Sequence, residues 1–306
     1  MKDLTLRQLR FLDETVRSGS LAGAAATLHL TPPAIAQQLR QLERSVGLPL
    51  LERGPGGQQP TEAGRLLLAT YARVDTELRS CADELAALAD ASTGQVAIGA
   101  VSTAKYFAPH VIAAFGESHP GVSVTISIGN RHEVIAMLED HAVDLAIMGR
   151  PPRQLEVEQE VFGEHPYVLV ARPEHRLARR RRLTWDDLAD ETFLVREPGS
   201  GTRQHLENLF ATSAEGPRTG MEIPSNETIK QAVMAGLGIA LISAHTVAAE
   251  VADGRLAVLP LRTMPIRRHW LVVRLASRRP SPATRAMWDY VVTHGAGHLP
   301  SVATGR

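Results

Sequence analysis

The N-terminal part of the chain alternates apolar and polar positions with a helical period, which predicts short amphipathic helices. A first helix over 5–17 begins at a capping box formed by Thr5 and Gln8. Ser20 caps a short alanine-rich helix over 21–28, whose small side chains allow a neighbouring helix to approach closely. The pattern therefore starts with two helices separated by a short turn.

A third helix follows at once, with Thr31 as its cap and Pro32 at its first position. Ile35, Leu39 and Leu42 form its apolar stripe, so glutamines and arginines occupy the opposite face. Gln can bond adenine and Arg can bond guanine in the major groove, which a helix-turn-helix enters with its second helix. A DNA-binding helix-turn-helix is one interpretation, and a solvated helix in an arbitrary bundle is the other.

The next segment predicts a two-stranded wing. The run 48–53 leads into a Gly-Pro-Gly-Gly turn, and residues 60–64 end the wing at a new helix cap. Wing and helices together would form one surface for DNA. The residues that we expect to contact DNA are Ser20, Thr31, Pro32, Pro33, Ala34, Gln37, Gln38, Arg40, Gln41 and Arg53.

From Thr61 to about Ser92 the chain runs without a strong helix breaker, and apolar residues alternate four and three apart. A helix of about 28 residues would be roughly 40 Å long. The seam favours an interface with a second copy, although it could also pack against the chain's own body. Cys81 lies on the seam, where we expect a small core residue rather than a thiol switch. The seam positions are Leu67, Tyr71, Val74, Leu78, Cys81, Leu85 and Leu88.

Beyond residue 93 the pattern changes to short β-rich runs that alternate with helices, which predicts parallel sheets and an α/β fold. The first βαβαβ unit has strands over 96–100, 122–128 and 145–148 and helices over 104–117 and 131–139. The pattern restarts with strands at 193–195, 221–223 and 239–242 and helices from 202 and over 227–235. Two similar subdomains result, joined by crossing strands over 167–171 and 270–274, and a last helix over 281–292 would return to the first subdomain.

Ligands of such sheets bind beyond the carboxyl ends of the strands, where helix N-termini offer free amides. Hydroxyls, amides and cations recur at these ends, so we expect an anionic ligand with a phosphate or carboxylate in the cleft between the subdomains. Any single Ser or Thr there could also be a plain helix cap. The expected ligand-binding residues are Ser102, Thr103, Lys105, Asn130, Arg131, Gly149, Arg150, Ser200, Gly201, Thr202, Arg203, Asn226 and Thr228.

The 306 residues include 33 Lys and Arg and 33 Asp and Glu, so bulk charge cannot bring the protein to nucleic acid and any DNA contact must be local. No stretch approaches the roughly 20 apolar residues of a membrane span, and the N-terminus lacks the apolar core of a secretion signal, so we expect a cytoplasmic protein with no membrane partner. The single Cys81 excludes an internal disulfide and a Cys-rich zinc site, and the 12 histidines lack zinc-ligand spacing. We therefore expect no metal and no cofactor.

Two other functional classes share part of this pattern. A transport-type binding protein has a similar cleft, but it would need a secretion signal and would lack the helix-turn-helix. An enzyme would need a catalytic set, yet Ser200 lacks the flanking spacing of a nucleophile elbow, and Ser243 with His245 is more often a surface pair than a dyad. The arginine run 179–182 is either a second phosphate patch or a solvated loop that leads into a helix cap at Thr184.

The N-terminal segments resemble the signature of LysR-type transcriptional regulators. Pro32 stands where that family usually has Gln, Ala36 stands where it often has Ser, and residues 56–59 are neutral where its wing is usually basic. These differences affect base reading and phosphate contacts and predict a shallower salt dependence of DNA binding. The residues that carry the resemblance are 6–11, 19–21, 24–25, 28, 30–31, 33–35, 38–43, 47, 49–50 and 61–64.

The resemblance implies an α/β protein with an N-terminal winged helix-turn-helix, a long linker helix and a C-terminal two-subdomain effector domain like that of periplasmic binding proteins. It implies a homodimer or homotetramer on double-stranded promoter DNA, with RNA polymerase as a further partner and no enzymatic activity. The expected boundaries are 1–63 for the DNA-binding domain, 64–93 for the linker and dimerisation helix, 94–165 with 268–300 for regulatory subdomain I and 166–267 for regulatory subdomain II.

Four segments of the C-terminal part are similar to the CbbR branch of this family, which regulates Calvin cycle carbon-fixation operons. They are 101–109, 144–152, 196–203 and 225–233. This similarity implies control of carbon-fixation genes and an effector such as a phosphorylated sugar, a phosphorylated acid or NADPH. The alternative is a LysR-type regulator of another metabolic operon. We hypothesise that effector binding changes the angle between the subdomains, and that the linker helices pass this change to the spacing of two recognition helices on DNA.

Overall fold

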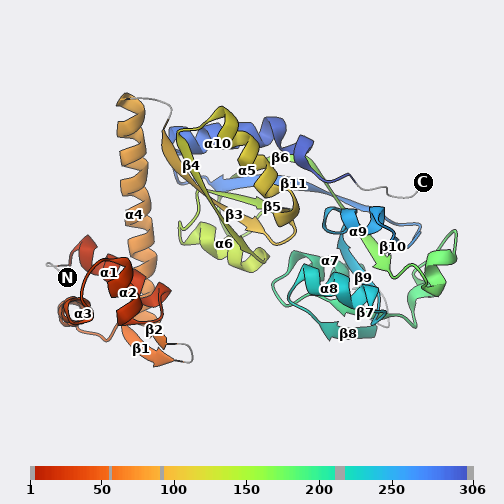
Figure 1. Ribbon diagram of the computed structural model, residues 1–306, viewed down its shortest axis with the longest axis horizontal. Helices are drawn as coiled ribbons and strands as arrows, with labels where there is room; N and C mark the ends of the chain where they lie inside the picture. The colour runs from red at the N-terminus through yellow and green to blue at the C-terminus, as the bar shows by residue number, and fades with distance from the viewer. Residues whose placement is uncertain (1–3, 55–56, 90–92, 211–217, 302–306) are drawn as a thin grey trace. The chain divides into compact units, whose positions relative to one another are not determined.

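The computed structural model describes residues 4–54, 57–89, 93–210 and 218–301. The chain forms two compact units, one of residues 1–81 with 140–142 and one of residues 82–139 with 143–306. They are called the N-terminal and the C-terminal unit below, and Figure 1 labels the helices and strands of each.

The N-terminal unit holds the predicted helices and wing. Its elements are α1 (Leu6–Arg17), α2 (Leu21–Thr27), α3 (Pro32–Val46), β1 (Leu51–Gly54), β2 (Gly57–Pro60) and the larger part of α4 (Glu62–Ala89). The capping box is confirmed, because the Thr5 hydroxyl accepts from the Gln8 amide at 3.3 Å and the Gln8 side chain accepts from the Thr5 amide at 3.2 Å. The Ser20 cap is confirmed as well, since its hydroxyl accepts from the Gly23 amide at 3.0 Å.

The cap position predicted at Thr31 is confirmed, and so is the proline after it. Thr31 does precede α3, but its side chain makes no capping hydrogen bond. Pro32 and Pro33 occupy the first two helical positions and have no N–H to donate. The next amide, that of Ala34, donates to the Thr31 carbonyl at 3.0 Å instead. The Thr31 hydroxyl is therefore left on the surface of the helix start.

The three helices enclose a small core, and a hydrogen bond joins the wing to the turn before α2. Leu12, Ile35 and Leu42 are fully buried in this core. The wing strands pair antiparallel, and the Gln58 amide donates to the Gly19 carbonyl at 2.7 Å. Gly57 has a φ of +121°, and a Cβ there would lie 2.2 Å from that same carbonyl oxygen, so the close approach requires glycine.

The long helix α4 has 28 residues, which corresponds to about 42 Å. Its first seam residues, Leu67 and Tyr71, pack on the N-terminal core. Four later ones are exposed in this chain, namely Val74, Leu78 (51%), Cys81 and Leu85 (61%), and the side chain of Leu88 lies outside what the structure describes. The end predicted near Ser92 lies outside the described residues. Whether the exposed part of the seam meets a second copy stays a prediction.

The C-terminal unit contains the predicted α/β pattern. Its first subdomain comprises β3 (Gly94–Val101), α5 (Ala108–Ser118), β4 (Val122–Gly129), α6 (Arg131–Glu139), β5 (Leu145–Met148) and α10 (Pro282–His294). The parallel pairing of β3 with β4 and with β5 confirms the βαβαβ unit. α5 and α10 cover one face of this sheet and α6 covers the other (Figure 1). Met287 and Val291 of α10 belong to its core, which confirms the return of the last helix.

The helix predicted over 104–117 is interrupted. A single 3₁₀ turn, η1 (Ala104–Tyr106), precedes α5, with Phe107 between them in a non-helical conformation. Pro109 explains the break, because it has no N–H to donate to the carbonyl of Lys105 one turn earlier. The residues just after β3 are thereby held as a loop.

The second subdomain is built around the far ends of two long strands. Its elements are η2 (Arg176–Arg179), η3 (Asp186–Leu188), β7 (Thr192–Val195), α7 (Gly201–Phe210), β8 (Arg218–Glu222), α8 (Asn226–Met234), β9 (Ala240–Ser243), η4 (Ala244–Thr246), α9 (Ala248–Ala252) and β10 (Ala257–Val258). The crossing strands are β6 (Val157–Ala171) and β11 (Ile266–Leu275), which pair antiparallel. The seven-stranded sheet has the order β10-β6-β11-β5-β3-β4, and β9 also pairs with β6.

The crossing strands are longer than predicted. The first half of β6, residues 157–164, is mostly polar and exposed. It carries little hydrophobic signal because backbone pairing with β11, rather than burial, keeps it extended. The added length places residues before Tyr167 on the same strand as Tyr167.

Candidate functional site

The outward face of α3 gathers most of the residues that we expect to contact DNA. Pro32, Pro33, Gln37, Arg40 and Gln41 are exposed on it. Within the described ranges no acidic side chain forms an ion pair with Arg40, so its guanidinium is available to a partner. The face therefore offers the amide and guanidinium groups that read base edges in a major groove.

The remaining expected DNA contacts are placed less directly. Gln38 is half-buried, and its side-chain oxygen accepts from Nε2 of Gln8 at 3.4 Å. The Ser20 hydroxyl already accepts the Gly23 amide in its capping role. Ala34 is half-buried, Thr31 is exposed at the start of α3, and Arg53 is exposed on the wing strand β1. These assignments stay predictions.

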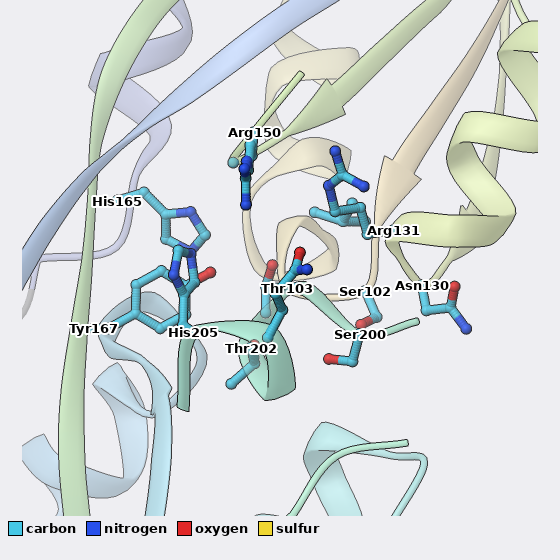
Figure 2. A pocket seen from close by; sticks show the side chains of 14 residues that line it. Ser102, Thr103, Asn130, Arg131, Arg150, His165, Tyr167, Ser200, Thr202 and His205 are labelled. Carbon is cyan, nitrogen blue, oxygen red and sulfur yellow. The ribbon is translucent and has the colours of Figure 1, made fainter. Parts of the chain in front are cut away.

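A pocket in the C-terminal unit lies where the parallel strands end (Figure 2). The empty space between its lining atoms, with its open mouth included, is about 510 Å³. It is called the effector pocket below, and it collects residues from the ends of β3, β4 and β5, from the start of α7 and from β6. Its lining residues are Val101, Ser102, Thr103, Asn130, Arg131, Gly149, Arg150, His165, Tyr167, Ser200, Gly201, Thr202, Gln204 and His205.

Most of the expected ligand-binding residues therefore line one pocket, as the strand-end argument predicts. Sequence reasoning missed Val101, His165, Tyr167, Gln204 and His205. One signal was available for two of them, because residues two apart on a strand face the same side. Using that signal would have required extending the crossing strand back from Tyr167.

Arg131 and Arg150 give the effector pocket its positive charge. Nη2 of Arg131 donates to the Pro151 carbonyl at 2.8 Å, but its Nε is buried without a hydrogen-bond partner. Burial lowers the pKa of Arg131, and the neighbouring charges of Arg150 and Arg153 lower it further. A bound anion would relieve this repulsion. The first turn of α7, which begins at Gly201, adds amides that have no partner within a helix.

Histidine rings form the opposite wall. Figure 2 shows His165, Tyr167 and His205 grouped on one side of the pocket, across from Asn130 and Arg131. The His165 ring stacks on Trp270 with centroids 3.7 Å apart and an interplanar angle of 12°. Both of its ring nitrogens are buried and have no hydrogen-bond partner.

These histidines are neutral near pH 7. Burial holds the pKa of His165 well below its usual range, and the nearby rings of His245 and His205 add to the effect. Burial also lowers the pKa of His205 to about 4, helped by the charges of Arg268 and Arg150. A neutral imidazole can donate one hydrogen bond and accept another. The wall can therefore bond a hydroxyl, a carbonyl or an amide without adding charge.

Four expected ligand-binding residues lie outside the effector pocket, and the side chains of three of them have another partner. Arg203 pairs with Glu207 at 2.8 Å and with Glu222 at 2.5 Å. Asn226 is buried and accepts from Arg196, while the Thr228 amide donates to the Ser225 hydroxyl at 3.3 Å. Lys105 pairs with Glu227 at 3.5 Å. Their roles as ligands remain predictions, which the pocket does not support.

Several of these contacts join the two subdomains. Nη2 of Arg196 donates to the Ser102 hydroxyl at 3.3 Å, and the Tyr106 hydroxyl donates to the Glu227 carboxylate. Within the second subdomain, Lys230, which is 4% exposed, pairs with Glu227 at 3.0 Å and so helps to position it. Ser102 belongs both to this joint and to the effector pocket, so a ligand there would touch the joint directly.

The structure also bears on the other classes of protein. Ser243 and His245 are buried, so the expected surface pair is wrong, and His245 accepts a hydrogen bond from Trp270 at 3.0 Å. Among the described residues, no group of three or more His, Cys, Asp or Glu is placed to hold a metal ion. In the same part of the chain, no helix is both long and apolar enough to cross a membrane.

A helix-turn-helix unit followed by an α/β unit with a polar pocket defines a ligand-responsive DNA-binding protein. Residues 6–65 match the family described as "Bacterial regulatory helix-turn-helix protein, lysR family", and residues 89–296 match "LysR substrate binding domain". The chain belongs to the LysR family of bacterial transcriptional regulators, and it is a regulator rather than an enzyme.

Relatives and solved structures agree with this assignment. The chain is 48% identical over 304 residues to the HTH-type transcriptional regulator CbbR of Xanthobacter flavus, covering 99% of this chain and 91% of the relative. It is 40% identical to the RuBisCO operon transcriptional regulator of Allochromatium vinosum, over 96% of this chain and 97% of the relative. The regulatory domain of Synechocystis CcmR in complex with 2-PG is 34% identical, with a TM-score of 0.63, and covers 66% of this chain and 97% of that chain. The LysR family regulator CbnR is 20% identical, with a TM-score of 0.69 over 94% of this chain and 98% of that chain, which shows a shared fold.

Proposed function

We propose that this protein regulates transcription of carbon-fixation genes, the RuBisCO operon among them, in response to a small anionic metabolite. The observation that carries the proposal is the convergence of Arg131, Arg150 and the first turn of α7 on one pocket. The near-full-length similarity to regulators named for CbbR and the RuBisCO operon supports the choice of genes. We expect it to act in the cytoplasm, where the promoters are.

The exposed face of α3 is the proposed DNA-reading surface. Arg40 and Gln41 are exposed on it and long enough to reach base edges, whereas Pro32 and Ala36 offer no hydrogen-bonding side chain. The positions at which the family usually has Gln and often Ser therefore cannot read bases here. Base recognition would rest more heavily on the later residues of the helix.

The exposed part of the α4 seam is the proposed dimer interface. Val74, Leu78 and Leu85 are large apolar residues that remain exposed in the single chain. Their spacing of four and seven is that of a heptad seam, which would be covered when two helices pack together. A dimer would also supply two recognition helices for two half-sites, and pairing of dimers into a tetramer would extend the contact along DNA.

The effector would combine an anionic group with a neutral polar group. The anionic group would lie against Arg131, Arg150 and the α7 amides, and the neutral group would reach the unpartnered nitrogens of His165. A phosphorylated acid or sugar has both. NADPH is the largest of the expected effectors.

Effector binding would act through the joint between the subdomains. Ser102 lines the pocket and also accepts from Arg196, so a ligand that accepts from the Ser102 hydroxyl would bond to a residue of the joint itself. A change in the joint would alter the subdomain angle, and α4 would carry it to the DNA-binding unit. Coupling of this kind typically amounts to about 1 to 3 kcal/mol, which tunes DNA binding without abolishing it.

The test is a gel shift with the purified full-length protein on its own upstream intergenic DNA and on a RuBisCO operon promoter, with scrambled DNA as control. Ribulose bisphosphate, phosphoenolpyruvate, 2-PG and NADPH are added singly. Specific binding that one of these metabolites alters supports the proposal. Specific binding only to other promoters would assign the regulator to another operon, and no specific binding would overturn the DNA-binding role of α3.

A further inference from the structure

A second cavity in the C-terminal unit lies in the second subdomain, away from the residues that line the effector pocket. Its empty volume is about 980 Å³, with its open mouth included. Arginines line one part and apolar side chains the rest, and it is called the basic cavity below. Its lining residues are Val168, Arg181, Arg182, Val258, Leu259, Pro260, Leu261, Arg262, Met264 and Pro265.

Backbone pairing between two distant segments builds the basic cavity. Leu183 forms a parallel bridge with Leu261, and its amide donates to the Pro260 carbonyl at 3.0 Å. The Arg262 amide donates to the Leu183 carbonyl at 3.1 Å. Both leucines are buried in the core below. The arginines next to them, Arg182 and Arg262, are consequently brought to the rim of one hollow.

The arginines that line the basic cavity are available to a ligand, whereas neighbouring arginines form ion pairs with carboxylates of the same chain. Arg176 pairs with Glu191 at 2.6 Å and Arg180 with Asp187 at 3.9 Å. In the ranges that the structure describes, no ion pair involves the arginines of the cavity, which are exposed, and no carboxylate lines it. Repulsion among these charges would fall if an anion bound between them.

The arginine run 179–182 does not lead into a helix capped by Thr184, as one interpretation of the sequence had it. Asp187 accepts from the Thr184 amide at 2.9 Å and from its hydroxyl at 3.0 Å, so Thr184 donates and does not cap a helix. A single 3₁₀ turn, η3, follows. This local bonding fixes the segment just after Arg181 and Arg182 and gives the arginine run a defined position.

We propose that the basic cavity binds a phosphorylated nucleoside. Its phosphates would lie against Arg181, Arg182 and Arg262. The planar guanidinium group of an arginine can donate two parallel hydrogen bonds to one phosphate, and it can also stack on an aromatic ring. Its base would lie on the apolar floor that includes Met264 and Pro265. Sites for small molecules are typically concave and mostly apolar with a few polar groups, and the lining of this cavity has that composition. The concave and largely apolar lining favours such a small molecule over DNA or an acidic protein segment.

This site would be distinct from the effector pocket although the two share a strand. Val168 lines the basic cavity, and its neighbour Tyr167 lines the effector pocket. Adjacent residues of β6 point to opposite faces, so each site is reached from its own side of the strand. The inference does not rest on the proposed control of carbon-fixation genes.

The test is isothermal titration of the full-length protein with ATP, tripolyphosphate and adenosine at about 0.15 M salt. The triple variant Arg181→Gln/Arg182→Gln/Arg262→Gln removes the charges from exposed side chains. Arg179→Gln is the matched control, because Arg179 belongs to the same run but does not line the cavity. Arg150→Ala removes a charge from the effector pocket alone.

The proposal predicts that ATP binds more tightly than tripolyphosphate or adenosine. The triple variant should weaken ATP binding about tenfold or more, whereas the Arg179 and Arg150 variants should change the dissociation constant of ATP by less than about twofold. Equal binding of tripolyphosphate and ATP would reduce the site to an anion patch and overturn the nucleoside. Loss of ATP binding in the Arg150 variant only would move it to the effector pocket. Unchanged ATP binding in the triple variant, or no ATP binding to the parent protein, would also overturn the proposal.

Discussion

The effector pocket has two kinds of wall, one formed by charged arginines and one by neutral histidines. Arg131 and Arg150 supply positive charge, and burial together with the charge of Arg150 lowers the pKa of Arg131. His165 is neutral, stacked on Trp270 and without a hydrogen-bond partner. Buried polar groups are usually satisfied, so both features indicate that a ligand completes this pocket.

Replacing Arg150 should separate ligand binding from DNA binding. Arg150→Ala should weaken effector binding about tenfold or more, because a charge-assisted hydrogen bond is lost. It should leave the affinity for promoter DNA within about twofold of the parent value. Arg40→Ala should do the reverse and cost about 1 to 3 kcal/mol on specific DNA. Calorimetry and gel shifts measure the two affinities, and Arg153→Ala, an exposed neighbour outside the pocket lining, is the control. Loss of DNA binding by a folded, dimeric Arg150 variant would contradict this division.

The buried histidines should make the C-terminal unit sensitive to acid. The folded-state pKa values of His205 and His245 are about 4, below the usual value of 6.5, so the unfolded chain takes up protons first as the pH falls. Their stabilising effect is therefore present above about pH 6.5 and is lost towards pH 4. Urea unfolding at pH 7.5 and pH 5 should show lower stability at pH 5. His205→Gln should reduce the difference, and a variant that loses as much stability as the parent would contradict the pKa assignment.

The residues of the pocket were only partly predictable. Ser102, Arg131 and Thr202 could be named because they follow strand ends or start a helix, which are local features of the sequence. His165 could have been named only by extending the crossing strand back from Tyr167, and its stacking on Trp270, which is distant in the chain, is not a local feature of the sequence. Thr31 is the predicted cap residue, but its side chain makes no capping hydrogen bond for a local reason, the second proline, which the sequence already contained.

Among the elements, the long strands and α4 have the clearest consequences. β6 and β11 link the two subdomains by backbone pairing, and their polar halves gave too little hydrophobic signal to be predicted in full. The periodic helices and the βαβαβ unit carry strong patterns and were predicted. The break at Pro109 shows that a single residue can divide an otherwise continuous helical pattern.

The seam on α4 should hold a dimer together. Leu78→Glu should weaken dimerisation about tenfold to a hundredfold, because a buried leucine contributes about 1.5 to 3 kcal/mol. Leu66→Glu is the matched control, since Leu66 is 70% exposed on the same helix but lies off the seam. Sedimentation equilibrium gives the two dissociation constants. Equal effects of both substitutions would show that the seam is not the interface.

The joint between the subdomains should be measurable as a pairwise coupling. Tyr106→Phe removes the donor of the hydrogen bond between these two residues, and Glu227→Gln removes the negative charge of its acceptor. The double-mutant cycle for unfolding should give a coupling of about 1 kcal/mol, because the acceptor is charged but half exposed. Tyr290→Phe combined with Glu227→Gln is the control and should give none. A Tyr106 cycle without coupling would mean that the contact does not hold the joint.

At the scale of the whole molecule, equal numbers of acidic and basic residues leave DNA binding to a local surface. The sequence could indicate two units and a long helix between them, because each has its own pattern. Oligomeric state and the path from effector to DNA depend on contacts between copies, which no pattern within one chain specifies. These features therefore rest on the family and on the exposed seam.

Footprinting on promoter DNA tests the central claim most directly, because it reports DNA binding and effector response together. The protein is bound to its own upstream intergenic DNA with and without each candidate metabolite. We predict a protected region whose boundaries move when one phosphorylated metabolite is added, and no movement in the Arg150→Ala variant. Boundaries that stay fixed with every metabolite, or that move equally in the Arg150→Ala variant, would contradict the account of the effector pocket.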